Sequence, residues 1–555
     1  MHSILVPSSS SAGLYLTRDA NIFYHSLHTL LAKPLEDYAS LRRLVRDSDS
    51  IALGHARGYL LQSTMFGFSI WWTPLVALLA VVLARYAYLI WFHPLSKYPG
   101  PKLAACTELW YAKSWTGGKW HVRINNAHRK YGDIIRIAPN ELSFASVQAF
   151  KDIYGPPSKT RKLFTKSDLF YDTGIQSIVF EMDPDEHAKQ YKLFAPSFRA
   201  SAVRSQEHVV QEHVDLFVSQ LKSRGEAGID ATAWFEWLAF DIIGQLAFGE
   251  SFGAVSRAEP HYWISLLHGA TYGSSVGLLA KRIAILGPIL RWAPRFSQGA
   301  ANAIKAMEQH AALTLEKTRS RVKMGNEHGV EDFLAPAIGR LSEEQLAHQG
   351  FIFLTAGAET SATALAAAVW YLSRPAHAHC LARLQDEVRN GFARYEDITG
   401  DAVAHLPYLN AVLEETMRLM PPSPVGPPRV SPGETVDGVY VPKGVYVSAD
   451  IWSFTRDPRN VEGPAGPDVF EPSRWVDPGR GRPYSAPFII GPRMCIGVNL
   501  AWLEMRVTLA KMVYAFDWAL KDEAEGDDWL ERCQLLQLWK KPKLMVRVTP
   551  KSKVT

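Results

Sequence analysis

Cysteine is scarce in this chain of 555 residues, which contains four, at positions 106, 380, 495 and 533. None of them pairs with another at the spacing of a metal site, and their density is too low for a disulfide scaffold. A reducing compartment is therefore expected. The chain also lacks an internal repeat, a long low-complexity tract and a G-x-G-x-x-G motif of the kind that binds flavin or nicotinamide nucleotides.

Charge of one sign is not in large excess. The chain has 60 Lys and Arg residues against 55 Asp and Glu residues, which gives a net charge of +5. The basic residues are spread along the sequence and match no nucleic-acid-binding motif. This pattern argues against nucleic acid as a partner and favours an acidic protein.

Hydrophobic residues make up 47% of the chain, enough for a large core. Their periodicity predicts a mainly α fold with small β-sheets. Helices are expected near 206–221, 235–248, 302–322 and 376–388, and short strands near 136, 142, 439–441 and 544–548. The length alone would suggest several domains, but the motifs below extend from 131 to 497, so a single catalytic domain over residues 102–555 is expected.

The one long uncharged hydrophobic run covers 66–84. At 1.5 Å per residue such a helix would cross about 28 Å of hydrocarbon, so residues 66–92 are predicted to be a transmembrane anchor. The alternative is a buried core helix. Residues 93–101 are rich in proline and are expected to form a hinge, and residues 1–65 are an N-terminal extension of unknown role that lacks a signal-peptide pattern.

The strongest chemical motif is F-x-x-G-x-R-x-C-x-G at residues 488–497, with Phe488 first and Cys495 as its cysteine. A lone cysteine is more often an inert core residue, but this spacing suits a thiolate ligand to a haem iron. Gly491 and Gly497 are expected to turn with positive φ, so that the backbone approaches a flat ring. Arg493 suits a carboxylate, and a helix starting just after Cys495 should favour the thiolate.

These ten residues resemble the signature of the cytochrome P450 family, the haem-thiolate monooxygenases. The resemblance implies the cytochrome P450 fold after an N-terminal transmembrane helix. It also implies heme b (iron-protoporphyrin IX) as the cofactor, with Cys495 as the axial ligand of the iron. Phe488, Gly491, Arg493 and Gly497 are then cofactor-binding residues.

A second motif, Ala356-Gly357-Ala358-Glu359-Thr360, resembles the oxygen-activating A-G-x-[DE]-T segment of the family. On a helix Ala356 and Thr360 share a face. The small Gly357 is expected to leave room beside the backbone for dioxygen and a water. Thr360 and Glu359 are predicted to manage protons as catalytic residues, with Ala356 and Gly357 near the cofactor. Alone, this stretch would read as a core helix.

A third motif is Glu415-x-x-Arg418, which is followed by prolines that must end its helix. An isolated pair of this kind is usually a solvated surface feature. The segment 470–475 resembles the F-x-P-x-R-[FW] segment of the family, and its Arg474 would join Glu415 and Arg418 in a buried structural network. We assign these three residues to structure and not to catalysis.

Further resemblance implies contacts to the haem propionates. The segment 183–198 resembles the family's C-helix, with His187 at the first contact position. Tyr191 stands where an arginine is usual, so a phenolic hydrogen bond would replace a charge. Arg429, which follows two prolines, matches another propionate partner. A hairpin is also expected over 131–144.

The resemblance also implies the biological setting. Electrons should come from NADPH through a separate NADPH-cytochrome P450 reductase, with cytochrome b5 as a further candidate donor. The protein should be a single-pass protein of the endoplasmic reticulum membrane, with its catalytic domain facing the cytoplasm. The sequence resembles fungal members that modify secondary metabolites, so the substrate should be a lipophilic small molecule. Substrate contacts are expected from 170–180, 263–290, 351–355 and 423–426.

Two alternatives remain open from the sequence. One is a haem-thiolate isomerase or dehydratase that works without a reductase, for which a disturbed A-G-x-E-T motif would be usual. The other is a non-catalytic membrane haem-binding protein, in which Glu359, Thr360 or the Cys495 loop would have decayed. The intact motifs favour oxygenation.

Overall fold

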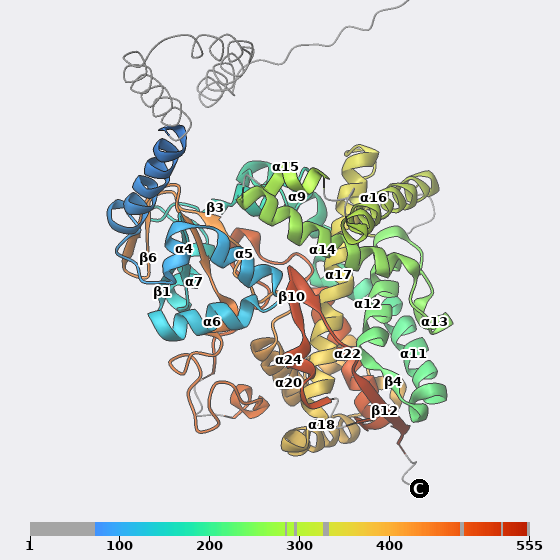
Figure 1. Ribbon diagram of the computed structural model, residues 1–555. Coiled ribbons are helices and arrows are strands. Elements are labelled where there is room, and N and C mark those ends of the chain that lie inside the picture. Colours follow the sequence, from blue (N-terminus) through green and yellow to red (C-terminus); the bar gives the residue numbers. More distant parts are fainter. Residues whose placement is uncertain are drawn as a thin grey trace, which may run out of the picture. The chain divides into compact units, whose positions relative to one another are not determined.

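The computed structural model describes residues 73–283, 286–292, 297–325, 332–477, 482–522 and 526–551. The chain divides into two compact units, residues 1–85 and 86–555. The predicted extension, residues 1–65, and the start of the predicted anchor, residues 66–72, lie outside the described residues. The described part is mainly helical with small sheets (Figure 1), as the sequence predicts.

The first described helix is Thr73–Phe92, whose mean hydropathy is 2.1 and of which only 6% is buried. It continues past the uncharged run, which ends at Ala84, and ends at Phe92, the predicted end of the anchor; its last turn, Tyr88–Phe92, is π-helical. One other described helix is apolar and long enough to cross a membrane, but it is 78% buried and forms part of the core. By length and composition alone, Thr73–Phe92 is the better candidate for a membrane span.

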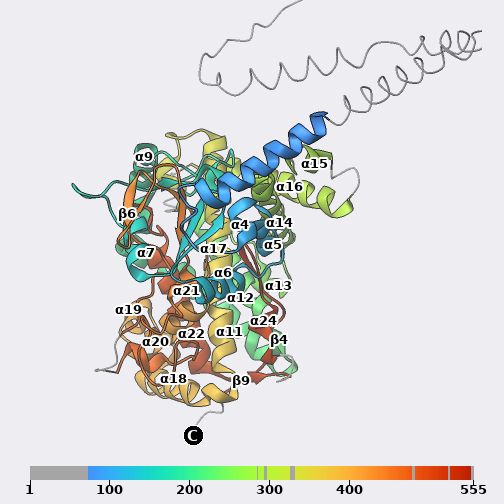
Figure 2. The same cartoon turned by 60° about the vertical axis from the view of Figure 1, so that its left-hand side comes forward.

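That buried helix is α17 (Glu343–Leu372), which runs through the middle of the helical region in both views (Figures 1 and 2). It starts at a capping box in which Ser342 and Gln345 bond each other's backbone N–H groups. Its main neighbours are α12 (Ala231–Phe248), α16 (Gln298–Met324), α20 (Pro407–Leu419) and α22 (Val498–Ala515). Because α12 is also buried on nearly every face, α17 is enclosed along most of its length.

The predicted helices are confirmed as α11 (Glu207–Arg224), α12, α16 and α18 (Ala378–Gly391). The other α-helices are α4 (Lys102–Cys106), α5 (Leu109–Thr116), α6 (Trp120–Tyr131), α7 (Val147–Tyr154), α8 (Asp168–Tyr171), α9 (Pro184–Phe194), α10 (Ala200–Ser205), α13 (Ala254–Arg257), α14 (Tyr262–Arg282), α15 (Leu286–Trp292), α19 (Gly400–Ala404), α21 (Ile451–Phe454) and α24 (Trp529–Arg532).

The largest described sheet has the strand order β1-β2-β8-β5-β3. The predicted hairpin is confirmed as β1 (Ile134–Ala138) and β2 (Glu141–Phe144), which pair antiparallel. β2 pairs parallel with β8 (Tyr446–Ala449), and β5 (Arg429–Val430) joins β8 to β3 (Thr165–Lys166). The register of β3 and β5 sets Lys166 directly opposite Arg429.

Three smaller sheets complete the described strands. One has the order β4-β12-β9, and each of the others is an antiparallel pair. The strands predicted near 439–441 and 544–548 are confirmed as β7 and β12. Their bounds are β4 (Ile229–Asp230), β12 (Met545–Pro550), β9 (Phe516–Leu520), β6 (Glu434–Val436), β7 (Val439–Val441), β10 (Gln534–Leu536) and β11 (Leu538–Lys540).

The predicted network of Glu415, Arg418 and Arg474 comes together in the core, where none of the three side chains is more than 1% exposed. Arg418 donates two hydrogen bonds to the Glu415 carboxylate, at 2.7 and 2.8 Å, and Arg474 Nε lies 3.4 Å from the same group. Trp475 Nε1 also donates to Glu415, at 2.9 Å. The network joins α20 to the segment 470–475, and α20 ends at Leu419, before the prolines.

Candidate active site

Cys495 lies in a loop that ends at the N-terminus of α22. Its backbone N–H donates to the Phe488 carbonyl at 2.9 Å, and its thiol opens on a cavity of about 330 Å³. Gly491 has a φ of 75°, and a Cβ there would lie 2.2 Å from the backbone oxygen of Tyr154. Gly491 is therefore required where the loop packs against the end of α7, and not only for an approach to a ring.

The prediction of a positive φ is wrong for Gly497, which has φ −85° and is the N-cap of α22. A Cβ added to Gly497 would meet no atom closer than the Cys495 sulfur, at 4.0 Å. The absent side chain therefore keeps the space beside the thiol open. The helix does start directly after the cysteine loop, as predicted.

Protonation of the Cys495 thiol is set by two opposing effects. Burial raises its pKa, and a hydrogen bond from the Gly497 N–H lowers it. The helix N-terminus thus lowers the pKa through one N–H group, but burial has the larger effect on the pKa. The Gly497 N–H, at the start of α22, therefore favours the thiolate as the sequence predicts, while burial opposes it.

One face of α17 lines the same cavity through Ala356, Gly357, Thr360 and Ser361. Thr360 Oγ1 donates to the Ala356 carbonyl at 2.6 Å, so the two residues share a face as predicted. The space beside Gly357 is filled, however. A Cβ there would lie 2.6 Å from Cγ1 of Ile243 on α12, so close packing of two helices explains this glycine and the expected room for dioxygen does not.

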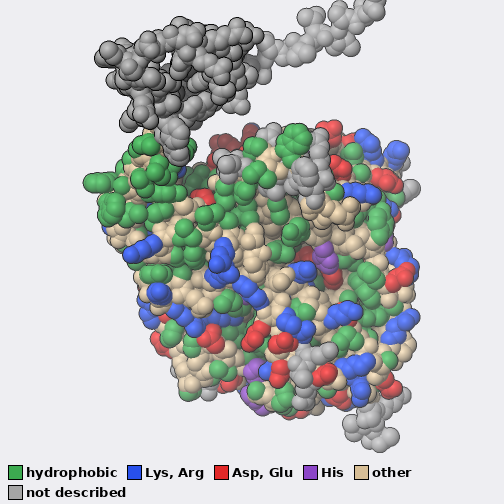
Figure 3. All heavy atoms as spheres, in the orientation of Figure 1, with side chains coloured by type: hydrophobic (Ala, Val, Ile, Leu, Met, Phe, Trp, Pro, Cys, Tyr) green, Lys and Arg blue, Asp and Glu red, His purple; other side chains and the backbone are tan. Residues whose placement is uncertain are grey.

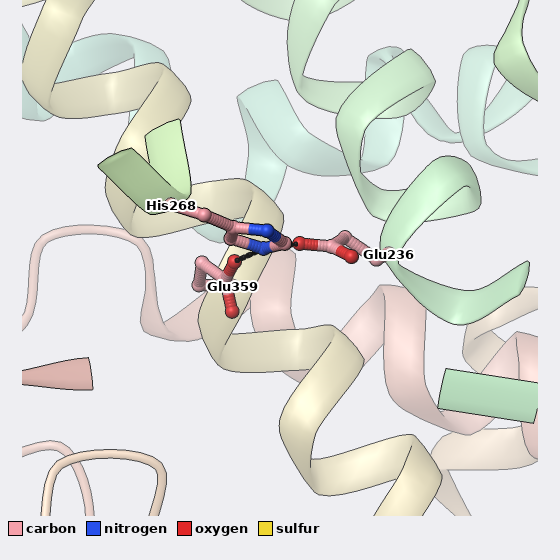
Figure 4. Close-up of side chains that lie close together, drawn as sticks. All are labelled: Glu236, His268 and Glu359. Carbon is pink, nitrogen blue, oxygen red and sulfur yellow. Dashed lines mark hydrogen bonds and ion pairs between the residues drawn. The ribbon is translucent and has the colours of Figure 1, made fainter. Parts of the chain in front are cut away.

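Glu359 does not line the Cys495 cavity, contrary to the prediction that it acts beside Thr360. Its carboxylate lies in a second cavity of about 680 Å³, where Lys541 Nζ is 2.8 Å from Oε2 and His268 Nε2 is 3.1 Å from Oε1. Figure 4 shows His268 between Glu359 and Glu236. The three residues come from three different helices, α14, α17 and α12 respectively. Consecutive helix residues point about 100° apart, so Thr360 faces the Cys495 cavity while Glu359 faces the second cavity, where it pairs with Lys541.

The charges in this second cavity are balanced. Burial raises the pKa of Glu359, but Lys541 and His268 overcome that effect and hold it below its ordinary value. Burial lowers the pKa of His268, but hydrogen bonds to Glu236 and Glu359 raise it to about 10. Burial and Glu359 raise the pKa of Glu236 to about 7. Both acids have partners within the protein, Glu236 in His268 and Glu359 in His268 and Lys541, so the arrangement is satisfied without any ligand.

The Cys495 cavity has the opposite character. Four basic side chains line it: Lys166, His187, Arg429 and Arg493. None of them forms an ion pair with a carboxylate in the described part of the chain. Burial, Arg493 and Arg429 lower the pKa of Lys166 to about 6, and burial and Arg429 lower that of Arg493 to about 10. Burial also lowers the pKa of His187, to about 3. Basic groups that burial and mutual repulsion shift toward the neutral form, and that no carboxylate offsets, fit a ligand that brings carboxylates of its own.

The structure brings together all of the predicted propionate contacts. Arg493 is held by the carbonyls of Glu181 and Met182, at 2.8 and 3.2 Å, and Tyr191 stacks near His187 with ring centroids 6.2 Å apart. Lys166 was missed by the sequence analysis, because no local motif marks it. Only the pairing of β3 with β5 places it beside Arg429.

The rest of the cavity lining is largely apolar. The segments 170–180, 351–355 and 423–426 contribute as expected, through Tyr171, Ile178, Val179, Ile352, Phe353 and Ser423. No described residue of the predicted segment 263–290 lines this cavity; five residues of that segment, Ser265, His268, Gly269, Thr271 and Tyr272, line the second one instead. An apolar cavity with a few polar groups suits a lipophilic ligand.

A mainly helical fold with a cavity-facing thiol opposite a threonine-bearing helix defines a haem-thiolate enzyme. Residues 99–546 match the cytochrome P450 family model. The chain is 36% identical to cytochrome P450 monooxygenase BOA3 of Botryotinia fuckeliana over 493 residues, which cover 86% of this chain and 95% of that protein. It is also 36% identical to cytochrome P450 monooxygenase poxC of Penicillium oxalicum (86% and 94% covered) and 34% identical to btcC of Colletotrichum orbiculare (83% and 91% covered).

This chain therefore belongs to the cytochrome P450 monooxygenase family. Membership of the family implies a haem-thiolate cofactor, and the residues present fit one. The Cys495 cavity offers one thiol that faces the open space and a group of basic side chains without anionic partners. The second cavity offers neither, since its charges are already paired.

Proposed function

We propose that this chain inserts one oxygen atom from O2 into a lipophilic small molecule, as a membrane-anchored monooxygenase of fungal secondary metabolism. The observation that carries the proposal is the Cys495 cavity, where a thiol, an uncompensated basic cluster and the Thr360 face of α17 meet. Catalysis at such a site needs all three: a ligand for iron, contacts for the propionates and a polar group where oxygen reacts.

The residues that would hold heme b are the thiol of Cys495 and the basic side chains of the cavity. Arg493, Arg429 and His187 would bind the propionates, with Lys166 as a fourth contact and Tyr191 as a hydrogen-bond donor. When bound, the haem would supply the activation of dioxygen. Phe488 and the open space at Gly497 would lie around the thiol, and Ala356 and Gly357 would form part of the opposite wall.

The chain's own residues would bind the substrate, exclude water and supply protons. Apolar side chains such as Ile178, Val179, Ile352 and Phe353 would bind and orient a lipophilic molecule by burying its surface. Thr360 presents a hydroxyl to the cavity, currently bonded to its own helix, that can turn to hold a proton or a water. Glu359 has no direct part in this proposal, because it lies in the other cavity.

The setting of the reaction is part of the proposal. Residues 66–92 would anchor the chain in the endoplasmic reticulum membrane, residues 93–101 would form the hinge, and residues 102–555 would form the catalytic domain on the cytoplasmic side. The exposed apolar helix Thr73–Phe92 supports the anchor. On the face drawn in Figure 3, basic side chains lie among acidic and apolar ones and form no continuous stripe. NADPH-cytochrome P450 reductase would supply electrons from NADPH, with cytochrome b5 as a second donor.

The direct test is an incubation of the full-length protein, a reductase and NADPH with extracts of lipophilic metabolites under heavy-isotope dioxygen. The proposal expects a product that carries one heavy oxygen atom, and no product when the reductase is omitted. A Cys495→Ala variant should yield no labelled product. Conversion that proceeds without reductase and without label would point to the isomerase or dehydratase alternative and would contradict the proposal.

A further inference from the structure

The second cavity brings three potential metal ligands together. His268 Nε2 lies 2.5 Å from Glu236 Oε1 and 3.1 Å from Glu359 Oε1. One ligand atom from each of the three residues lies within 4.8 Å of the other two. In Figure 4 the two carboxyl groups approach the same imidazole ring. One imidazole nitrogen and two carboxylate oxygens at one point are a donor set that suits a transition-metal ion.

The three ligands are held by long helices of the fold. Glu236 is on α12, His268 on α14 and Glu359 on α17, which are helices of 18, 21 and 30 residues. The two glutamate side chains are only 9% and 6% exposed, whereas that of His268 is 57% exposed. An ion can therefore reach the cluster past His268, and the cavity of about 680 Å³ leaves room for water as a further ligand.

The cluster needs no ligand in order to fold, but the two acids in it still repel each other. Burial and the neighbouring Glu359 raise the pKa of Glu236 to about 7, although His268 lies between the two carboxyl groups. Glu236 is 7% exposed, and its second oxygen, Oε2, has no nitrogen or hydroxyl donor among the described residues. A divalent cation would relieve this repulsion, because its two positive charges match those of the two carboxylates.

The distances in the cluster are close to those of a metal site. Zinc binds imidazole nitrogen and carboxylate oxygen at about 2.0–2.2 Å in a tetrahedral arrangement, which places neighbouring ligand atoms about 3.3 Å apart. The separations of 2.5 and 3.1 Å between Nε2 and the two oxygens therefore need to grow by less than about 1 Å. Rotation of the side chains about their own bonds gives a change of that size without movement of the helices.

We propose that Glu236, His268 and Glu359 bind a divalent transition-metal ion of the zinc type in the second cavity. The ion takes the place of the proton on His268 Nε2, which passes to solvent, and water from the cavity completes the coordination. No electron moves. The site is separate from the Cys495 cavity, and the bound ion ties α12, α14 and α17 together at one point.

Lys541 sets the affinity of this site. Its Nζ lies 2.8 Å from Oε2 of Glu359, so it fixes that carboxylate and leaves Oε1 for the ion. Its positive charge also opposes a second cation, so the ion competes with Lys541 for Glu359. The imidazole nitrogen selects against Mg²⁺ and Ca²⁺, which prefer oxygen ligands.

Zinc itself is the probe for the first test, made with purified, haem-loaded, full-length protein. Competition with a chromogenic chelator should show one Zn²⁺ per chain, which an excess of Mg²⁺ or Ca²⁺ should not displace. X-ray absorption at the zinc edge should show nitrogen and oxygen neighbours at about 2.0–2.2 Å and no sulfur at about 2.3 Å. Absence of stoichiometric binding, or a sulfur neighbour from a cysteine, would overturn the proposal.

Variants of the ligands locate the ion. Glu236→Gln and His268→Ala should each weaken zinc binding by at least about tenfold, since even groups behind a metal ligand change affinity by that much. His208→Ala is the matched control, because His208 is exposed on α11, one helical turn before Glu212, and should leave binding unchanged. Equal affinity in the wild type and both ligand variants would mean adventitious binding at the surface and would contradict the proposal.

Lys541→Met should change zinc binding in the opposite direction, which a general loss of stability cannot do. Without the competing cation, zinc should bind at least about tenfold more tightly and raise the melting temperature more than in the wild type. In Lys541→Met/Glu359→Gln, which lacks one of the ligands, zinc should have little effect. An equal zinc-induced rise in the melting temperatures of all three proteins would refute the assignment of these ligands.

Discussion

Two cavities share helix α17, and they treat charge in opposite ways. In the cavity of Glu359, two carboxylates face His268 and Lys541, so positive and negative charges pair within the protein. In the Cys495 cavity, four basic groups have no carboxylate partner among the described residues, and Glu504 has an oxygen without a hydrogen bond. Buried polar groups that the protein leaves unsatisfied are costly, and they mark the cavity that is built for a ligand.

The largest expected effect comes from the core network of Glu415, Arg418 and Arg474. Arg418→Ala leaves Glu415 as a buried charge without its bidentate partner, which should cost about 3–5 kcal/mol of unfolding free energy. We expect little or no incorporated haem and a much lower melting temperature. The measurements are haem absorbance per protein and thermal unfolding.

The control for that variant is Arg394→Ala. Arg394 also pairs with a carboxylate three residues away, but its side chain is 72% exposed. An exposed pair contributes at most about 1 kcal/mol, so haem content should stay normal. Normal haem content in Arg418→Ala would refute the structural role of the network.

The next largest effect is expected from a variant that removes one charge from the second cavity. Lys541→Met removes the cation that faces Glu359 at 2.8 Å, and should cost about 3 kcal/mol. The double variant Lys541→Met/Glu359→Gln removes both charges and should recover most of that stability. Thermal unfolding of the wild type and the two variants measures these stability differences. A double variant no more stable than Lys541→Met would contradict the claim that the two charges compensate each other.

The stability lost in Lys541→Met should depend on pH. The pKa of Glu359 lies below its ordinary value of 4.5 in the folded protein, so the pair adds stability above pH 4.5 and loses it as pH falls. The difference between wild type and variant should therefore grow as pH rises through about 4.5 and shrink at lower pH. A difference that is constant with pH would mean that packing, and not charge, explains the loss.

The smallest effect concerns the residue that sequence motifs did not reveal. Lys166→Met removes one of four basic groups from the Cys495 cavity, so haem should be lost about fivefold faster, which corresponds to about 1 kcal/mol of hydrogen bonding to a propionate. Transfer of haem to an excess of apomyoglobin measures this rate. Lys189→Met, on the same helix as His187 but 71% exposed, should leave it unchanged. Equal rates in wild type and Lys166→Met would remove Lys166 from the site.

The sequence predicted those features that short motifs carry. The Cys495 loop, the Ala356 to Thr360 face and the meeting of Glu415 with Arg418 all follow from local spacing, which a helix or a tight loop converts directly into geometry. The hairpin over 131–144 follows for the same reason.

The features that the sequence did not predict depend on partners far along the chain. Lys166 reaches the site through the pairing of β3 with β5, and Glu359 pairs with Lys541, which lies 182 positions later in the chain. The space beside Gly357 is filled by Ile243 from another helix. Contacts between residues far apart in the sequence determine these positions, and local sequence motifs carry no signal for such contacts.

The most direct test of the central claim is the absorption spectrum of purified full-length protein, reduced with dithionite and exposed to carbon monoxide. A cysteine thiolate on the haem iron predicts a strongly red-shifted Soret band in the wild type and its absence in Cys495→Ala. A reduced carbon monoxide complex whose Soret band stays at the position typical of histidine-ligated haem, or a Cys495→Ala spectrum equal to that of the wild type, would contradict the account.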